Sequence, residues 1–280
     1  MPLVTPSETV AVLERHGLHL SSELGQNFLV DANVLKKIIA AAELAPGDVV
    51  VEVGAGIGTL TEALAAGGAT VYSLELDRRL GGVLRETVGL AENVHIRLAD
   101  ALRFDLGSLP EMPRKLVSNL PYNIAGPLLA EWPRRYPEIE LYVVMVQKEM
   151  ADRLLAPPGG KQYAALSLKV QLFCRGKRVA EVPRTVFIPR PHVDSAILRL
   201  ERMPPPIPAE EVGAFLSLVD GVFAQRRKML RATLPKYLGQ PKEAVEPGLT
   251  RAGLTGAERP EALSLEQFLR LYEEVKALAV

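Results

Sequence analysis

The residues best suited to chemistry in this chain form the short sequence Asn119-Leu120-Pro121-Tyr122. The Asn119 side-chain oxygen and the Leu120 carbonyl can both accept hydrogen bonds from a planar exocyclic amine, such as N6 of adenine. Such bonds stabilise the amine as it becomes pyramidal, so that its lone pair attacks an electrophile without a general base. Pro121 stiffens the turn, and Tyr122 offers an aromatic face for the base. A plain Asn-Pro turn with a buried tyrosine is the simpler alternative.

A second aromatic ring is expected on the other side of the base, because stacking on aromatic rings is a common way to hold a base. Phe187 is the candidate, since it begins a proline-braced segment at residues 187–195. The alternative is that Phe187 is an ordinary core residue. The predicted catalytic residues are therefore Asn119, Leu120, Tyr122 and Phe187.

A glycine-rich turn, Gly54-Ala55-Gly56-Ile57-Gly58, follows an apolar stretch that is typical of a buried strand. Glycines in such a turn let the backbone approach a ligand closely. Acidic residues follow at the ends of the next two predicted strands: Glu75, placed to accept hydrogen bonds from ribose hydroxyls, and Asp100, placed to accept one from an adenine amino group. Each alone could be a helix cap or a solvated turn residue. Together with the glycine turn they outline an adenosine-shaped site.

Two adenosine-containing cofactors compete for such a site. A nicotinamide dinucleotide carries a pyrophosphate and favours the pattern GxGxxG, in which the third glycine packs in the following helix. Thr59 stands at that third place here, and the turn contains no Arg or Lys. S-adenosylmethionine has an adenosine but no phosphate, so the sequence favours this cofactor, with S-adenosylhomocysteine as its product. A nicotinamide-dependent oxidoreductase is the alternative from a different class.

The elements that must position these residues alternate between strands and helices. Strands are expected at residues 48–53, 70–76, 93–98, 115–118 and 141–146, with helices at 60–66 and 77–87. This spacing requires right-handed crossovers and predicts a parallel sheet covered on both faces. An antiparallel pair is expected to follow, around residues 178–182 and 194–200. The predicted fold class is α/β, a Rossmann-like, mostly parallel sheet of the class I S-adenosylmethionine-dependent methyltransferase type.

A proline-rich stretch at residues 203–208 separates this part from the C-terminal part of the chain. Four prolines in five positions cannot lie inside a helix or a central strand, so the stretch is predicted to be a stiff linker. We expect a catalytic domain over residues 1–203, which begins with an extension of about 24 residues. A small all-helical domain is expected over residues 204–280, with helices at 210–234 and 264–278.

Basic residues in the first of these C-terminal helices are candidates for binding RNA. The chain has 33 basic and 33 acidic residues, so contact with a polyanion must depend on a local patch. At helical spacing Arg227, Lys228 and Arg231 fall on one face, and Arg226 lies beside them. A merely solvated helix face is the alternative. In that case the preferred RNA contact is a second basic cluster, formed by Arg175, Lys177, Arg178 and Arg184.

The composition is that of an ordinary soluble protein, with 48% apolar and 24% charged residues. No apolar run approaches the roughly 18 residues that span a bilayer, and the N-terminus lacks a secretory pattern. The single cysteine, Cys174, excludes an internal disulfide and a multi-thiolate metal site, so no metal is expected. The sequence therefore predicts a cytoplasmic protein without a membrane partner.

These motifs, in this order, resemble those of the ribosomal RNA adenine N6,N6-dimethyltransferases, and most closely the bacterial small-subunit branch associated with kasugamycin sensitivity. The resemblance runs from about Gly25 to Leu234. It includes Gly25-Gln26-Asn27-Phe28-Leu29, Leu74-Glu75-Leu76-Asp77, Gln147-Lys148-Glu149 and Gln225-Arg226-Arg227-Lys228. It departs at Ala125-Gly126, where relatives more often carry hydroxyl groups, and in the extension before Gly25.

The resemblance implies methyl transfer to N6 of two adjacent adenines in the 3′-terminal hairpin loop of 16S ribosomal RNA, with two methyl groups on each. It also implies a monomeric enzyme of ribosome biogenesis that acts within a 30S subunit or its precursor. The cofactor contacts that it implies are Gln26, Asn27, Leu29, Gly54, Gly56, Glu75, Leu76, Asp100, Ala101 and Asn119. Two alternatives stay open: a 23S enzyme of the macrolide-resistance type, and a non-catalytic ribosome-assembly or transcription factor.

Overall fold

The computed structural model describes residues 4–19 and 27–278. The chain divides into two compact units: unit 1 comprises residues 1–151 and 174–202, and unit 2 comprises residues 152–173 and 203–280. This division differs from the expected one in a single segment, residues 152–173, which groups with the C-terminal helices. Its contacts explain the difference, because Lys169 forms an ion pair of 2.7 Å with Asp220, far along the chain. Pairings at such sequence distances leave no local pattern in a single sequence.

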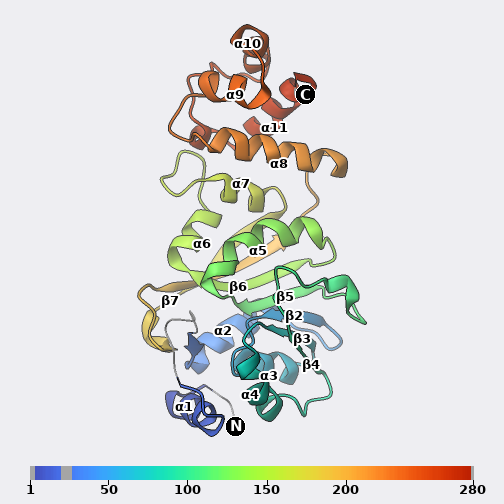
Figure 1. Ribbon diagram of the computed structural model, residues 1–280, viewed down its shortest axis with the longest axis vertical. Helices are drawn as coiled ribbons and strands as arrows, with labels where there is room; N and C mark the ends of the chain where they lie inside the picture. Colours follow the sequence, from blue (N-terminus) through green and yellow to red (C-terminus); the bar gives the residue numbers. More distant parts are fainter. Residues whose placement is uncertain (1–3, 20–26, 279–280) are drawn as a thin grey trace. The chain divides into compact units, whose positions relative to one another are not determined.

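Unit 1 is built on a seven-stranded sheet in the order β4-β3-β2-β5-β6-β9-β7 (Figure 1). Its parallel strands are β2 (Val49–Val53), β3 (Thr70–Glu75), β4 (Val94–Leu98), β5 (Lys115–Asn119) and β6 (Leu141–Gln147). Strand β9 (Ser195–Arg202) pairs antiparallel with both β6 and β7 (Cys174–Val182). The predicted Rossmann-like α/β fold and its antiparallel pair are thereby confirmed.

Both faces of this sheet are buried. Val143 and Met145 of β6 pack in one cluster with Ile38 and Leu64 from the helices of one face. Tyr142, which points the other way, is fully buried as well, and α5 contacts the same strand. Burial on both faces is the reason that these strands are continuous apolar runs rather than alternating patterns. The helices of unit 1 are α1 (Pro6–Arg15), α2 (Ala32–Ala42), α3 (Thr59–Ala66), α4 (Gly81–Thr87), α5 (Tyr122–Arg135) and the first part of α6 (Lys148–Leu154).

The strand register brings together the carboxyl ends of the strands that carry the predicted site residues. Glu75 is paired with Leu98 at the end of β3, and Asn119 is paired with Met145 at the end of β5. Because neighbouring parallel strands end at the same edge, these side chains and the turn after β2 share one edge of the sheet. A separate two-stranded sheet, β1 (Phe28–Leu29) with β8 (Phe187–Ile188), joins two distant segments of the chain.

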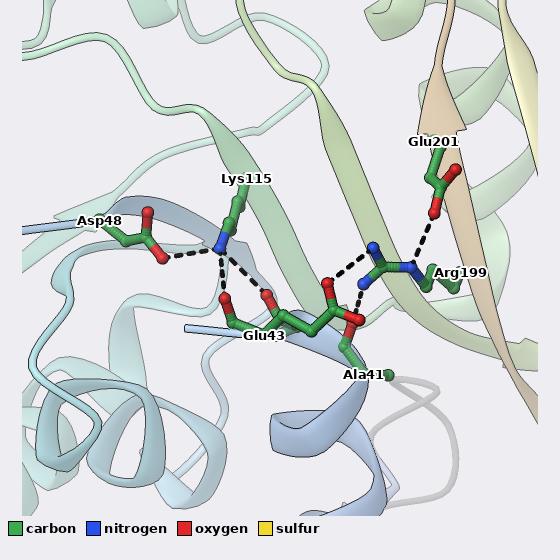
Figure 2. A network of polar contacts seen from close by, with 7 residues as sticks. Ala41, Glu43, Asp48, Lys115, Arg199 and Glu201 are labelled. Carbon is green, nitrogen blue, oxygen red and sulfur yellow. Dashed lines mark hydrogen bonds and ion pairs between the residues drawn. The ribbon is translucent and has the colours of Figure 1, made fainter. Parts of the chain in front are cut away.

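Lys115 caps the C-terminus of α2, which leads into β2 (Figure 2). Its ammonium group donates to the carbonyls of Ala42 (3.1 Å) and Glu43 (2.8 Å) and to the carboxylate of Asp48 (2.6 Å). Burial by itself raises the pKa of Asp48, but the Ala45 amide and the Lys115 ammonium stabilise the carboxylate and hold this pKa below its ordinary value. The last carbonyls of the helix are thus satisfied from β5.

Arg199 of β9 caps the same helix end from another strand (Figure 2). Its guanidinium donates to the carbonyl of Ala41 and pairs with the carboxylates of Glu43 (3.0 Å) and Glu201 (3.1 Å). Only 12% of the Arg199 side chain is exposed, so these bonds are shielded from water. Two cations from β5 and β9 therefore fix the position of α2 on the sheet.

Unit 2 is helical over its C-terminal part, with α8 (Ala209–Phe223), α9 (Leu230–Leu238), α10 (Lys242–Arg251) and α11 (Leu265–Val275), and it also contains α7 (Ala165–Gln171). The expected single helix at residues 210–234 is wrong, because the chain turns at residues 224–229 between α8 and α9. The backbone N–H groups of Leu230 and Arg231 donate to the carbonyls of Glu258 and Gly256, both at 2.9 Å. These bonds satisfy the first turn of a new helix where a continuous helix was expected.

No described helix has the length and apolar character needed to cross a membrane.

Candidate active site

A cavity of about 370 Å³ lies at the carboxyl edge of the parallel strands in unit 1. Its volume is within the usual range for small-molecule sites. Among its lining residues are eleven of the predicted ones: Asn27, Leu29, Gly54, Gly56, Glu75, Leu76, Asp100, Ala101, Asn119, Leu120 and Tyr122. Gln26 lies outside the described residues. The separately predicted adenosine site and Asn-Leu-Pro-Tyr motif are therefore parts of one cavity wall.

The glycine turn approaches the Asn-Leu-Pro-Tyr motif closely. Gly54, Gly56 and Gly58 have φ values of 80°, 59° and 92°, a left-handed conformation that other residues rarely adopt. A Cβ atom on Gly54 would lie 2.8 Å from Cγ of Pro121. Gly54 is therefore required both by its backbone conformation and by the packing of the two motifs.

Glu75 is a buried carboxylate that the glycine turn itself holds. One oxygen accepts a hydrogen bond from the Gly56 amide (2.8 Å), and the other accepts one from the Asp77 amide (2.9 Å). Burial raises the pKa of Glu75, while these two bonds act in the opposite direction. A carboxylate has about four acceptor positions, so both oxygens retain capacity for ribose hydroxyls.

Leu76 and Asp100 complete the side of the cavity next to Glu75. Leu76 is 66% exposed, although it is a large apolar residue, and it offers the cavity an apolar surface. One oxygen of Asp100 accepts from the Leu102 amide (3.0 Å), and the other lies 3.6 Å from the Arg103 guanidinium. Asp100 thus caps a turn and also lines the cavity, so a structural role in the turn is compatible with a role in binding a ligand.

Asn119 ends β5 with its amide group oriented. Its Nδ2 donates to the backbone carbonyl of Asn27 at 3.2 Å, which leaves Oδ1 as the acceptor for a donor in the cavity. The next residue, Leu120, also lines the cavity, although it is only 1% exposed. The Asn119 amide and the residue that follows it therefore belong to one stretch of the cavity wall.

Tyr122 begins α5 and lines the same cavity. Its hydroxyl lies 3.0 Å from Oγ of Ser195, and either oxygen can donate in this hydrogen bond. Burial raises the pKa of the Tyr122 hydroxyl, so it is a neutral group at pH 7. The ring is available as an aromatic surface, while its far end is fixed by β9.

Phe187 is not part of the cavity wall in this structure. Its side chain is 4% exposed and packs in the core cluster that contains Leu29, its partner in the β1–β8 pair. The predicted stacking role is therefore not supported by this arrangement, and the alternative of a core residue describes it. The pairing of two segments almost 160 residues apart is what buries the ring, and no local pattern indicates it.

The charge of the cavity is set by four carboxyl groups and one paired cation. Glu52, Glu75, Asp77 and Asp100 line it, and among the described residues of its lining only Arg79 is a cation. Arg79 forms an ion pair of 2.7 Å with Asp77. Asp77 and Asp100 each lie beside an arginine, and burial raises the pKa of Glu52. The carboxylate left for a ligand is therefore mainly that of Glu75, which favours a cationic group over a pyrophosphate.

Glu52 is a residue that the sequence analysis did not single out. It is 1% exposed, and its carboxyl group accepts hydrogen bonds from the hydroxyls of Thr61 and Ser73. Burial raises its pKa to about 7 in spite of these bonds. The sequence does mark Glu52 as unusual, because it is the one acidic residue within a buried strand of four valines.

The predicted RNA-binding residues lie in unit 2, outside this cavity. Arg227 and Lys228 are exposed in the turn at residues 224–229, and Arg231 is exposed in the first turn of α9, so they do not share one helix face as expected. Arg226 forms an ion pair of 2.9 Å with Glu261. We call Arg227, Lys228 and Arg231 the basic turn.

Within the described part of the chain, no group of three or more His, Cys, Asp or Glu side chains is placed to hold a metal ion.

Comparisons with known proteins agree with this geometry. The model of the ribosomal RNA adenine dimethylase family matches residues 17–277. The chain is 41% identical to ribosomal RNA small subunit methyltransferase A from Streptococcus pneumoniae over 99% of both chains. It is 39% identical to the protein of the same name from Geobacillus kaustophilus, over 96% of this chain and 95% of that one.

Two solved structures are similar over most of the chain. A dimethyladenosine transferase from Plasmodium falciparum has a TM-score of 0.77 and 26% identity, covering 90% of this chain and 98% of that one. The 23S ribosomal RNA methyltransferase ErmE has a TM-score of 0.69 and 31% identity, covering 89% of this chain and 100% of that one.

Proposed function

The chain belongs to the ribosomal RNA adenine dimethylase family, and from this premise we propose that it transfers methyl groups from S-adenosylmethionine to N6 of adenines in small-subunit ribosomal RNA. In full, the target is two adjacent adenines in the 3′-terminal hairpin loop of 16S RNA, within a 30S subunit or its precursor. Because ribosomal RNA is the substrate, the proposed compartment is the cytoplasm. The proposed active form is a monomer.

One observation carries the assignment of the chemistry: a single cavity is lined both by an adenosine-type site with Glu75 and by the Asn-Leu-Pro-Tyr motif with its oriented Asn119 amide. S-adenosylmethionine bears a positive sulfonium, and the Glu75 carboxylate suits that charge. The same carboxylate opposes the pyrophosphate of a nicotinamide dinucleotide. The family and its methyltransferase relatives likewise do not support the oxidoreductase alternative.

In the proposed reaction, S-adenosylmethionine supplies an electrophilic methyl group on its sulfonium. Glu75 would hold the ribose hydroxyls, and Leu76 would pack against the adenine of the cofactor. Asn119 Oδ1 and the Leu120 carbonyl would accept the two N6 protons of the target adenine, which favours a pyramidal nitrogen whose lone pair attacks the methyl carbon. The transfer would break the bond between the methyl group and the sulfonium sulfur, with S-adenosylhomocysteine as the leaving product. N6 would then lose one proton to water, so that no cavity residue has to act as a general base.

The small-subunit target is favoured over the large-subunit alternative by the extent of the similarity. The two relatives named as small-subunit enzymes match 39% and 41% of positions over nearly the whole of both chains. ErmE, named as a 23S enzyme, matches 31% over 89% of this chain. The same similarity to enzymes opposes a purely non-catalytic assembly or transcription factor.

We place RNA binding in the C-terminal helical part, through the basic turn. Exposed Arg and Lys side chains in a turn can neutralise phosphates without distorting a helix. A target adenine must also leave its stack to enter the cavity, which favours an unpaired loop.

The proposed target is tested by offering the enzyme unmethylated small-subunit and large-subunit particles with isotopically labelled S-adenosylmethionine. Digestion and mass spectrometry then locate the label. We expect N6,N6-dimethyladenosine in the 3′-terminal hairpin loop of the small-subunit RNA. Labelling of large-subunit RNA alone would support the macrolide-resistance alternative instead.

A further inference from the structure

The segment at residues 187–195 reaches the active site through Ser195 rather than through Phe187. Ser195 begins β9 and is fully buried. A buried hydroxyl needs a hydrogen-bond partner, and that of Ser195 is the hydroxyl of Tyr122 at 3.0 Å. The ring of Tyr122 lines the cavity, so Ser195 contacts the active site through this ring.

Ser195 is itself held by the sheet and by its neighbour. It is paired with Gln147 of β6 on one side and with Val182 of β7 on the other. The carbonyl of the preceding residue, Asp194, accepts from the Lys148 amide at 2.9 Å. Strand pairing on both sides makes the Ser195 hydroxyl a fixed point for anything bound to it.

The carboxylate of Asp194 adds a second anchor just before Ser195. It accepts a hydrogen bond from the Arg184 amide at 2.9 Å, and the Arg184 guanidinium donates to the His192 carbonyl at 2.9 Å. Arg184 thus ties the residues just before Ser195 together through Asp194 and His192. These bonds restrict the movement of the Ser195 backbone.

Tyr122, in contrast, depends on the hydrogen bond to Ser195 for its position. It is the first residue of α5 and is only partly buried. The hydroxyl of a tyrosine lies on the axis about which its ring rotates, so a partner there restricts χ1 and fixes the position of the ring, not its rotation about that axis. The place that the ring takes in the cavity wall is therefore held from β9.

We propose that Ser195 is a positioning residue for methyl transfer, which holds the Tyr122 ring in place and so sets the position at which the target adenine stacks. This inference rests on the proposed function. The position of the stacked base determines where N6 lies relative to Asn119 and Leu120. Ser195 would therefore act on the reaction without touching the substrate.

The second methyl transfer should depend on the position of the Tyr122 ring more than the first. An unmodified N6 has two protons, one for each of the two acceptors. After one transfer N6 keeps a single proton, so the base loses one of the two bonds that orient it. Stacking on Tyr122 then has a larger share in positioning N6.

The test compares Ser195→Ala, Tyr122→Phe and the double variant in single turnovers with unmethylated small-subunit particles. Tyr122→Phe keeps the stacking ring and removes only the hydrogen bond. We expect each single variant to slow the second transfer by about 3- to 10-fold and the first transfer less, with N6-monomethyladenosine accumulating. The double variant should resemble either single variant, because both changes remove the same bond. Ser195→Thr, which keeps a hydroxyl, should restore much of the dimethyl product.

Ser167→Ala is the matched control, because Ser167 is another fully buried serine whose hydroxyl donates a hydrogen bond, to the Arg153 carbonyl in unit 2. It should lower the melting temperature and leave the ratio of monomethyl to dimethyl product unchanged. Multiplicative losses in the double variant, or an unchanged product ratio in Tyr122→Phe, would overturn the positioning role. A wild-type enzyme that transfers no methyl group to these particles would instead contradict the proposed function.

Discussion

Glu75 and Glu52 are two carboxyl groups of one cavity that serve different purposes. Glu75 is held by backbone amides and keeps acceptor positions for a ligand, whereas Glu52 is bonded to two side-chain hydroxyls. Both have a raised pKa because both are buried. At the scale of residues, the site therefore combines one group for binding with one whose ionisation affects stability.

Replacing Glu75 by Ala should weaken S-adenosylmethionine binding by about 1–3 kcal/mol, because charge-assisted hydrogen bonds to the ribose are lost. Calorimetric titration measures this directly. Glu92→Ala, which removes an exposed carboxylate outside the cavity lining, is the control and should bind normally. Unchanged affinity in Glu75→Ala would refute the ribose contact, and tighter binding of NADH than of S-adenosylmethionine would favour the oxidoreductase.

Glu52 should make the folded state less stable as the pH rises. Its pKa is about 7 in the folded chain and near the ordinary value of 4.5 in the unfolded chain, so the unfolded chain releases the proton at lower pH. Between these values the folded state binds more protons, and the free energy of unfolding falls with pH by about 3 kcal/mol in total. Glu52→Gln should lack this loss. Urea unfolding from pH 4.5 to 8 tests it, and parallel profiles for the two proteins would disprove it.

At the scale of elements, helix α2 depends on two cations that belong to distant strands. Lys115 and Arg199 bond the last carbonyls of the helix and are mostly shielded from solvent. The strand β1, with Leu29 in the cavity wall, lies just before α2. A stable helix end therefore supports one wall of the active site.

Lys115→Met should lower the free energy of unfolding by about 2–4 kcal/mol, because it leaves helix carbonyls and the Asp48 carboxylate without their cation. Denaturant unfolding at pH 7 measures the loss. Lys177→Met, at an exposed position of β7, is the control and should change stability by less than about 0.5 kcal/mol. Equal stability of the two variants would show that the cap contributes little.

The elements that could be predicted are those with a local cause. The strands β2 and β6 are apolar runs because the sheet is covered on both faces, and such runs are visible in any sequence. The break between α8 and α9 has no such cause, since it depends on amides that bond to carbonyls near residue 257. The burial of Phe187 has no local cause either, because it follows from pairing with Leu29.

The residues that the structure brings into one cavity were predicted from motif positions. A glycine turn followed by acidic strand ends can be recognised from spacing, and parallel strands necessarily bring those ends together. Glu52 and Ser195 were missed, since their importance comes from what is packed around them. Contacts between distant segments cannot be recognised from a local sequence pattern.

In the whole molecule, methyl transfer is assigned to unit 1 and RNA binding to the basic turn of unit 2. Replacing Arg227, Lys228 and Arg231 together by Gln should reduce the log–log salt slope of RNA binding by about 0.7–0.9 for each lost phosphate contact. Cofactor affinity should stay normal, because the cavity is in unit 1. Filter binding at several salt concentrations measures the slope.

Lys242→Gln, which removes an exposed charge from α10, is the control for a general charge effect. Its salt slope should match that of the wild type. A triple variant with an unaltered slope would mean that the basic turn is merely solvated. The cluster of Arg175, Lys177, Arg178 and Arg184 in unit 1 would then become the preferred RNA contact.

Asn119 is proposed to assist methyl transfer to an adenine N6 in this cavity, and single-turnover kinetics with Asn119→Ala test this role. The measurement uses saturating S-adenosylmethionine and RNA, with both affinities determined for the same variant. We expect a transfer rate lower by about 10²–10³-fold with RNA affinity nearly unchanged, because the lost bond matters most as N6 becomes pyramidal. A transfer rate equal to that of the wild type would contradict it.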